Sequence, residues 1–298
     1  MIVEIIESLL VLSVLIACIR AVYTDWKYRY IEDELTYGLI IIGVVLNGII
    51  SLITWNYLPI LFSIVSAGAV YAIGYLRFYF GELGGGDVKL FTGILASLPT
   101  YPLLLAKFLP HEFIFTFAVT LFINVFFLGV IYQLFYLVYK SVSERKKFSK
   151  EYKSFFRKYK SLYFFGAGIM LLLFTYFFRK SFFVVSVIII IFYWLSLLLF
   201  SFALSAEKLM VFYAKPSQVE EGDKPIKNIL LDGKLIYKKR RIGLITSDLE
   251  ILRKLEKQGK INQIKFRDGI PYAPAFLLGV LFSVLVGDLI SALLQLII

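Results

Sequence analysis

Two aspartates stand beside residues that could position them for acid–base chemistry. Asp25 follows the apolar run that opens the chain, and Asp87 follows three glycines, Gly84, Gly85 and Gly86. Two carboxylates placed close together share a proton, because like charges a few Å apart do not both ionise easily. The ionised carboxylate can take a proton from water while the protonated one polarises a carbonyl group. The pair would therefore hydrolyse an amide bond by an aspartyl mechanism.

The sequence around Asp87 favours this role. The glycines remove side chains next to it, so a substrate backbone could approach closely. Asp87 is also predicted to lie at a helix N-terminus, which favours its ionised form. Each aspartate alone has a structural alternative, since Asp is a preferred helix cap and Asp25 could be a charge at the membrane edge. The two together, with Lys89 following Asp87, favour catalysis.

Other reactive side chains are scarce. The chain has one cysteine, Cys18, inside the first apolar run, and one histidine, His111, beside Pro110. A single cysteine forms no internal disulfide or CxxC zinc site, and one histidine offers little for a nucleophile or a metal centre. We therefore expect carboxylate chemistry without a metal or a cofactor.

The composition predicts a membrane protein. Hydrophobic residues make up 59% of the chain and the mean hydropathy is +0.80, whereas soluble domains are about 45–50% apolar. The first run carries Glu4 and Glu7 where a signal peptide has basic residues, so we expect it to be a retained span. The pattern predicts an all-α polytopic membrane protein of about eight transmembrane helices with a small α+β cytoplasmic domain. The spans are expected at 5–22, 37–54, 58–78, 87–109, 112–139, 161–178, 182–205 and 272–297.

The basic residues predict an orientation. If the loop after the first span is cytoplasmic, 29 of the 32 Lys and Arg lie on that side, as the positive-inside rule requires. Both termini then lie outside, and Asp25 and Asp87 share the cytoplasmic face of the cell membrane. The net charge of +11 is thus a signal of topology and lipid contact, and we expect no nucleic-acid partner.

The same patterns divide the chain into four parts. We expect a catalytic core at 1–139, a basic segment with two additional spans at 140–205, a small cytoplasmic domain at 206–270 and a last span at 271–298. Nine basic residues and several aromatics alternate in 140–160, which predicts a helix that extends a span or lies on anionic lipid. In the small domain, Asp232-Gly233 predicts a hairpin turn, and Ser247 with Glu250 resembles a capping box.

These residues resemble a known family. Asp25 with Ile31-Glu32-Asp33 six to eight positions on, and Gly84-x-Gly86-Asp87 followed by Lys89, are similar to the archaeal preflagellin and type IV prepilin peptidases, which are GxGD-type membrane aspartyl proteases. The resemblance covers roughly residues 1–110 and touches Pro271-Tyr272-Ala273-Pro274 and Gly287-Asp288 in the last span. It implies an endopeptidase that removes short basic leaders from archaellin or type IV pilin-like precursors, with Asp25 and Asp87 as the catalytic pair and no metal.

The chain also departs from that family. Bacterial relatives usually carry Pro-Asn or a similar pair after the isoleucine and a cysteine tetrad, but this chain has Glu32-Asp33 and no tetrad. We therefore expect peptidase activity without N-methylation. The apolar pair at 161–205 adds to the six-span plan of the preflagellin peptidases, which leaves archaellin and pilin both open as substrates. The oligomeric state and the role of 206–270 are open too.

Two further interpretations concern the charged residues. The acidic group Glu32, Asp33, Glu34 and Glu82 is expected to attract the basic leader of a substrate. Its alternative is a solvated loop whose acids pair with Lys27 and Arg29. The competing functional class is a non-enzymatic, ion-coupled transporter that uses intramembrane acids; it requires both aspartates to line a continuous aqueous path.

Overall fold

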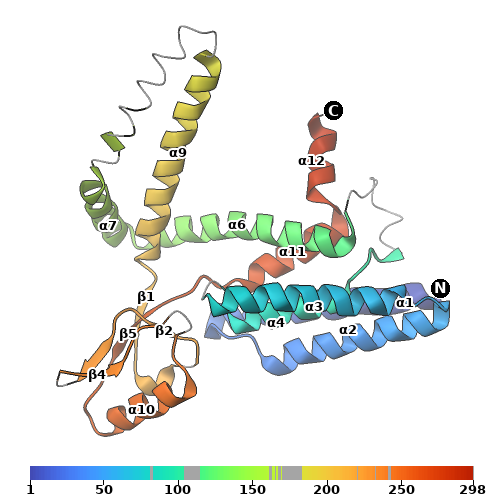
Figure 1. Cartoon of the computed structure of the whole chain (residues 1–298), viewed down its shortest axis with the longest axis horizontal. Coiled ribbons are helices and arrows are strands. Elements are labelled where there is room, and N and C mark those ends of the chain that lie inside the picture. The colour runs from blue at the N-terminus through green and yellow to red at the C-terminus, as the bar shows by residue number, and fades with distance from the viewer. Residues whose placement is uncertain are drawn as a thin grey trace. The chain divides into compact units, whose positions relative to one another are not determined.

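The computed structural model describes residues 1–80, 83–103, 115–160, 163, 164, 166, 169, 183–219, 221–231, 233–240 and 243–297. These residues form two compact units (Figure 1). The first unit comprises Met1–Tyr132 with Phe212–Ile298, and the second comprises Gln133–Val211. Both candidate aspartates belong to the first unit.

Four of the described helices are long and apolar enough to cross a membrane. Each provides the roughly 20 apolar residues that a span needs. They are α1 (Ile2–Tyr28), α2 (Asp33–Thr54), α3 (Leu58–Tyr79) and α6 (Phe117–Ser143). The predicted membrane protein is therefore found, but the predicted eight spans are not confirmed. Much of the expected span 161–178 and His111 lie outside the described residues.

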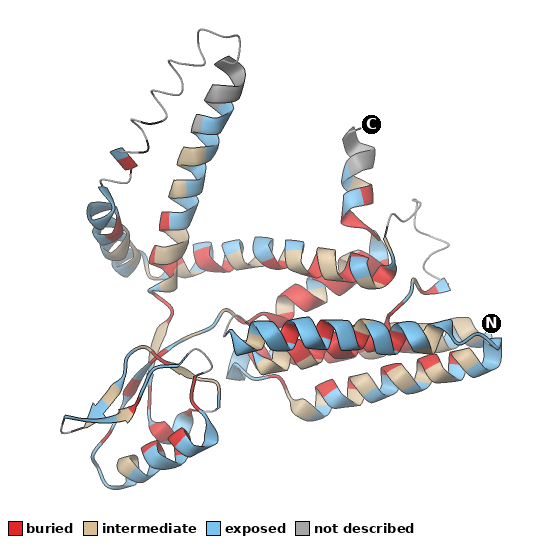
Figure 2. Cartoon of the chain, viewed as in Figure 1, coloured by how far each residue is buried: buried red, intermediate tan, exposed pale blue. Residues whose placement is uncertain are grey.

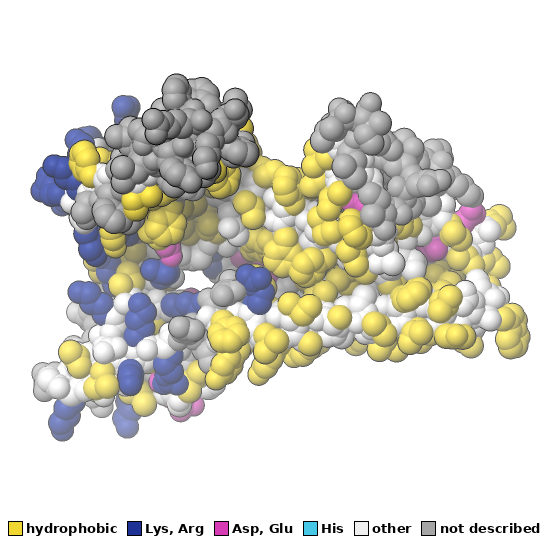
Figure 3. Space-filling model, turned by 45° about the horizontal axis from the view of Figure 1, so that its top comes forward, with side chains coloured by type: hydrophobic (Ala, Val, Ile, Leu, Met, Phe, Trp, Pro, Cys, Tyr) yellow, Lys and Arg dark blue, Asp and Glu magenta, His cyan; other side chains and the backbone are white. Residues whose placement is uncertain are grey.

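The outer faces of these helices are apolar. Ile41 and Val65 are more than half exposed, and Leu52 is 76% exposed. Figure 2 shows exposed residues alternating with buried ones along α2 and α3, and Figure 3 shows apolar side chains gathered over this face. An apolar surface of this extent favours lipid as its neighbour.

The helix α4 (Gly85–Ser97) lies at the centre of the bundle and packs against α2 and α3. It ends before Pro99, so the predicted span 87–109 is not one continuous helix. Its freed carbonyls need partners in this apolar setting. Asn47 Nδ2 donates to the Ala96 carbonyl at 3.1 Å, and Ser63 Oγ donates to the same carbonyl at 2.6 Å. Side chains of α2 and α3 therefore stabilise the end of α4.

The last apolar segment is also broken. It forms α11 (Ala273–Leu285) and α12 (Leu289–Ile297), so the expected span 272–297 is not a single helix. Gly287 has a φ of 91° at the break. Asn124 of α6 donates to the Gly287 carbonyl at 2.8 Å, and Asp288 accepts from Ser291 Oγ at 2.9 Å. Asp288 therefore helps to stabilise the break.

A small α+β fold follows the second unit. Its antiparallel hairpin confirms the predicted turn, with Gly233 at a φ of 76°, and Tyr237, Leu252 and Phe266 lie in its core. A three-stranded sheet has the order β1-β5-β2. The elements are β1 (Val211–Ala214), the 3-10 helix η1 (Pro216–Gln218), β2 (Lys224–Pro225), β3 (Ile229–Leu231), β4 (Lys234–Tyr237), α10 (Thr246–Lys257) and β5 (Ile264–Arg267).

The predicted capping box of this domain is wrong. The helix α10 begins at Thr246, one residue before Ser247. Asp248, three residues after Ile245, accepts a hydrogen bond from the Ile245 N–H at 3.1 Å. Arg240 also contacts Asp248 at 2.8 Å. Asp248 is therefore held both as a cap and as an ion-pair partner, and Glu250 has no part in the cap.

The second unit contains α7 (Arg145–Lys158) and α9 (Phe183–Glu207). Aromatic contacts join the two helices, such as Phe148 with Phe202 at 5.4 Å between ring centroids. Phe155 is buried, and Glu151 pairs with Lys208 at 3.1 Å. The basic residues of α7 are exposed, so this helix presents a cationic face and an apolar face.

Candidate active site

Asp25 lies in the last turn of α1 and is 8% exposed. Its Oδ2 accepts a hydrogen bond from the backbone N–H of Ala273 at 3.0 Å. That N–H belongs to the first turn of α11, where it has no partner within the helix. Close by, Arg29 Nε lies 3.3 Å from Asp268 Oδ1. The first helix and the segment before α11 therefore meet at Asp25.

Asp87 lies in the first turn of α4, as the sequence predicts. Its Oδ2 accepts a hydrogen bond from the Gly84 N–H at 3.1 Å, so Asp87 also caps its own helix. At Gly86, an added Cβ would lie 2.9 Å from Ile31 Cβ. The absence of a side chain at Gly86 thus lets the segment between α1 and α2 approach the first turn of α4.

The structure brings the two predicted aspartates together. The Asp25 carboxyl is near enough to act electrostatically on Asp87, although the two residues come from separate helices. Each accepts a backbone N–H, which leaves carboxyl oxygens for further contacts. The geometry can therefore support a pair that shares one proton.

A small cavity of about 20 Å³ adjoins Asp87. This volume is about enough for one water molecule. Side chains from α3, α4, α6 and α11 form its wall. They include Arg77, Asp87, Phe91, Phe126, Tyr272 and Phe276. The wall is mostly apolar, with Asp87 and Arg77 as its charged members, so a water in it would contact Asp87 in an otherwise apolar setting.

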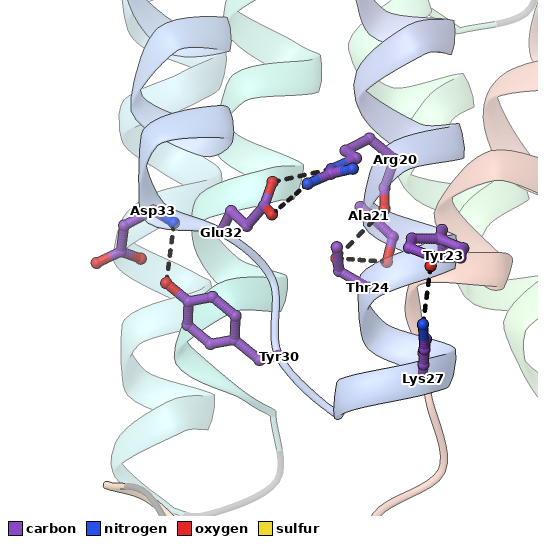
Figure 4. Close-up of polar contacts among 8 residues, drawn as sticks. All are labelled: Arg20, Ala21, Tyr23, Thr24, Lys27, Tyr30, Glu32 and Asp33. Atoms are coloured by element: carbon purple, nitrogen blue, oxygen red, sulfur yellow. Dashed lines mark hydrogen bonds and ion pairs between the residues drawn. The ribbon is translucent and has the colours of Figure 1, made fainter.

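The acidic segment between α1 and α2 has definite partners (Figure 4). Arg20 Nη2 lies 2.7 Å from Glu32 Oε1, and this guanidinium holds the pKa of the Glu32 carboxyl below its usual value. Lys89 Nζ lies 2.7 Å from Asp33 Oδ1. The alternative interpretation expected these acids to pair with Lys27 and Arg29. In the structure, Glu32 pairs with Arg20 and Asp33 pairs with Lys89.

The remaining predicted leader-binding residues differ from these two. Glu34 is exposed and makes no hydrogen bond or ion pair with any other residue that the structure describes. Glu82 lies outside the described residues. Among the described acids of this group, Glu34 thus has the charge that is most available to a ligand.

Sequence reasoning missed three residues around the aspartates. Arg77 and Tyr272 line the cavity with Asp87, and Ala273 holds Asp25. The Pro271-Tyr272-Ala273-Pro274 segment was noticed for its resemblance alone, because hydrophobic patterning does not show where a distant helix begins relative to α1. Within the described part of the chain, no three His, Cys, Asp or Glu side chains gather closely enough to hold a metal.

The fold and the site define a helical membrane protein in which Asp87 adjoins a water-sized cavity and Asp25 lies on a neighbouring helix. Residues 10–136, which include Asp25 and Asp87, match the type IV leader peptidase family. The resemblance seen in the motifs is therefore confirmed over this part of the chain.

Three curated relatives agree with that match. Prepilin peptidase EppA of Methanothermobacter thermautotrophicus is 31% identical over 166 residues, which are 54% of this chain and 43% of that protein. The preflagellin peptidase of Methanococcus voltae is 34% identical over 47% of this chain and 60% of its own length. The preflagellin peptidase of Methanocaldococcus jannaschii is 37% identical over 28% of this chain and 35% of its own length. The chain thus spans roughly half the length of the curated relatives it matches. No solved structure matches the chain.

Proposed function

We propose that this protein is a membrane aspartyl endopeptidase, with Asp25 and Asp87 as its catalytic pair. It removes short basic leaders from archaellin or type IV pilin-like precursors at the cytoplasmic face. One observation carries the proposal: Asp25 and Asp87 lie on helices that contact each other, and Asp87 adjoins a water-sized cavity. The family match over both residues and the names of the curated relatives support it.

The chemistry follows from two carboxyl groups that hold one proton between them. The ionised carboxylate removes a proton from water as the water oxygen attacks the scissile carbonyl carbon. The protonated carboxyl donates its proton to the carbonyl oxygen, which gives a neutral tetrahedral diol. The diol collapses as the C–N bond breaks: one carboxyl group gives its proton to the leaving amine, and a diol hydroxyl returns a proton to the other carboxylate. The pair ends with one proton, ready for another water.

The motif residues support this chemistry by positioning. The Gly84 N–H orients Asp87, and Gly86 admits Ile31 next to it. Lys89 does not point to a substrate role, because it pairs with Asp33 at the start of α2. Gly86 therefore sets how closely Ile31 approaches the first turn of α4, and Lys89 ties α4 to α2.

The substrate matches the surroundings of the pair. A precursor with an apolar N-terminal helix can lie in lipid beside the apolar outer faces of α1–α3. Its basic leader would then meet the acidic segment at the start of α2. Among the described acids Glu32, Asp33 and Glu34, Glu34 is best placed to attract it, since Glu32 and Asp33 already have cationic partners.

The helix α7 gives this protein a second contact with the membrane. Its basic side chains are exposed, and its aromatic face packs on α9. A cationic amphipathic helix that directly follows an apolar span fits an anionic lipid surface. The second unit would thus hold the chain at the bilayer surface through charge, and raising the salt concentration should weaken this contact.

A cleavage assay with purified protein tests the proposal. The substrate is a synthetic precursor with a basic leader and an apolar helix, and mass spectrometry locates the cut. The wild type should release the leader, and the double variant Asp25→Asn with Asp87→Asn should not. Cleavage that persists in the double variant, or its absence in the wild type, would contradict the proposal. The transporter alternative requires ion flux in vesicles that depends on the same aspartates.

A further inference from the structure

Gly129 of α6 and Tyr272, at the start of α11, fit tightly together. An added Cβ at Gly129 would lie 2.3 Å from the Tyr272 hydroxyl oxygen and 3.0 Å from Cζ of its ring. Contacts this short do not occur between real side chains, so position 129 accepts only glycine while the ring stays in place. Tyr272 is 8% exposed, and its hydroxyl makes no hydrogen bond with another described residue. The ring is therefore held by packing.

A second close contact fixes the same two helices. An added Cβ at Gly279 of α11 would lie 2.3 Å from Val125 Cγ2 and 2.7 Å from Val125 Cα. Two glycines, one on each helix, thus let α6 and α11 approach at backbone distance, as small residues do in membrane bundles. The helix α11 therefore has little freedom to slide along α6 without a clash at Val125.

This packing bears on the aspartates because Tyr272 is adjacent to Ala273. The Ala273 N–H donates to Asp25, and the Tyr272 side chain lines the cavity with Asp87. The start of α11 thus contacts Asp25 through the Ala273 N–H and lines the cavity beside Asp87 through the Tyr272 side chain. The buried ring has little room to rotate, so a clash with it would displace the Tyr272 backbone and would move the adjacent Ala273 N–H away from Asp25.

We propose that Gly129 and Tyr272 are positioning residues, which hold the Ala273 N–H on Asp25. The inference rests on the proposed function, because it assigns the contact to the catalytic pair. A hydrogen bond to a carboxylate favours its ionised form. Loss of this N–H should therefore raise the pH at which Asp25 titrates. The other charged groups near Asp25 are Arg29, Asp268 and Asp87.

The test measures the titration of Asp25 by difference infrared spectroscopy of the full chain in detergent. An Asp87→Asn background leaves one carboxyl of the pair, and subtraction of Asp25→Asn assigns its band. Gly129→Ala should raise the midpoint by about one pH unit. Gly68→Ala is the matched control, because a Cβ at that helical glycine has no neighbour within 4 Å, and it should leave the midpoint unchanged.

A second variant separates positioning from misfolding. Tyr272→Phe removes the atom that the new Cβ would strike first, so in the double variant it should return part of the shift caused by Gly129→Ala. If Gly129→Ala does not fold, Tyr272→Leu removes the end of the ring and should raise the midpoint in the same direction. Equal midpoints for Gly129→Ala and Gly68→Ala, or no change in Tyr272→Leu, would overturn the inference.

Activity gives an independent readout in the chain with both aspartates. Gly129→Ala should lower kcat about tenfold with little change in KM, and should move the acid limb of the pH profile upward. Gly68→Ala should behave as the wild type. A wild type that cleaves no precursor would contradict the proposed function, whereas the titration experiment would still decide whether Gly129 and Tyr272 position Asp25.

Discussion

Lys89 Nζ lies 2.7 Å from Asp33 Oδ1, and this ion pair joins the helix that carries Asp87 to the first residue of α2. On the other side, Arg20 of α1 makes a 2.7 Å contact with Glu32, the residue before α2 begins. The start of α2 is thus tied to both aspartate-bearing helices. These acids lie where a helix N-terminus also favours negative charge, so they stabilise the frame of the site.

The Lys89–Asp33 pair should contribute measurably to stability. Lys89→Ala and Asp33→Ala should each lower the Tm in detergent, and the double variant should lose less than the sum of both. Since both side chains are partly exposed, the coupling should be on the order of 0.2–1 kcal/mol. Thermal unfolding of the four proteins measures it, and additive losses would show that the pair is not coupled.

The Arg20–Glu32 pair should show a pH dependence of defined sign. The guanidinium lowers the pKa of Glu32 in the folded protein, compared with about 4.3 in an unfolded chain. Its stabilisation is therefore fully present above the unfolded pKa and is lost as the pH falls through the folded pKa. Glu32→Gln should lower the Tm at pH 7 but not at about pH 3. A difference that persists at low pH would contradict this.

Replacing Asp25 or Asp87 should lower kcat far more than replacing another carboxylate. Asp25→Asn or Asp87→Asn should lower kcat by about 10²–10⁴-fold, since each removes a proton donor or acceptor. KM should change little, and the folded protein should remain. Asp288→Asn is a suitable control because Asp288 contacts Ser291 at the α11–α12 break. Substantial activity in either catalytic variant would contradict the assignment.

The sequence predicted the pair because its members follow simple local rules. Asp25 stands where an apolar run ends, and Asp87 stands three residues after Gly84, where an acid can cap a helix. The sequence did not predict Ala273, which meets Asp25 across 248 positions. That contact depends on how α11 packs against α1 and fits beside Gly129 of α6, which hydrophobic patterning does not show. The partner of Asp25 is therefore set by packing between helices that are distant in sequence, which local patterns do not predict.

Breaks inside apolar segments were also hard to predict. A continuous apolar run predicts one span, yet α4 ends at Ser97 and the last segment divides at Gly287. Both breaks depend on side chains from other helices, such as Asn47 and Asn124, that satisfy freed backbone groups. Pro99 follows the first break, but the side chains that permit the break are distant in sequence.

The orientation of the chain can be tested with reporters. Because 29 of 32 basic residues lie in segments assigned to one side, fusions after residues 150 and 240 should both report the cytoplasm. A fusion at Trp55, between α2 and α3, should report the opposite side. A reporter after residue 240 that reads extracellular would contradict the cytoplasmic location of the site.

Glu34 should carry most of the attraction for a basic leader. Glu32 and Asp33 have cationic partners, whereas Glu34 is exposed and has none among the described residues. Glu34→Gln should therefore raise KM for a basic-leader precursor about two- to fivefold and leave kcat nearly unchanged, because this contact forms before the chemical step. The effect should decrease as salt screens it.

A precursor with a neutral leader provides the control. Its KM should be nearly the same for the wild type and for Glu34→Gln, since no charge pair is lost. Replacing Glu32, Asp33, Glu34 and Glu82 together with Gln or Asn should raise KM further, but it should also lower the Tm, because two of these acids tie α2 to α1 and α4. If Glu34→Gln affects both precursors equally, Glu34 supports the fold or the aspartate pair and does not recognise the leader.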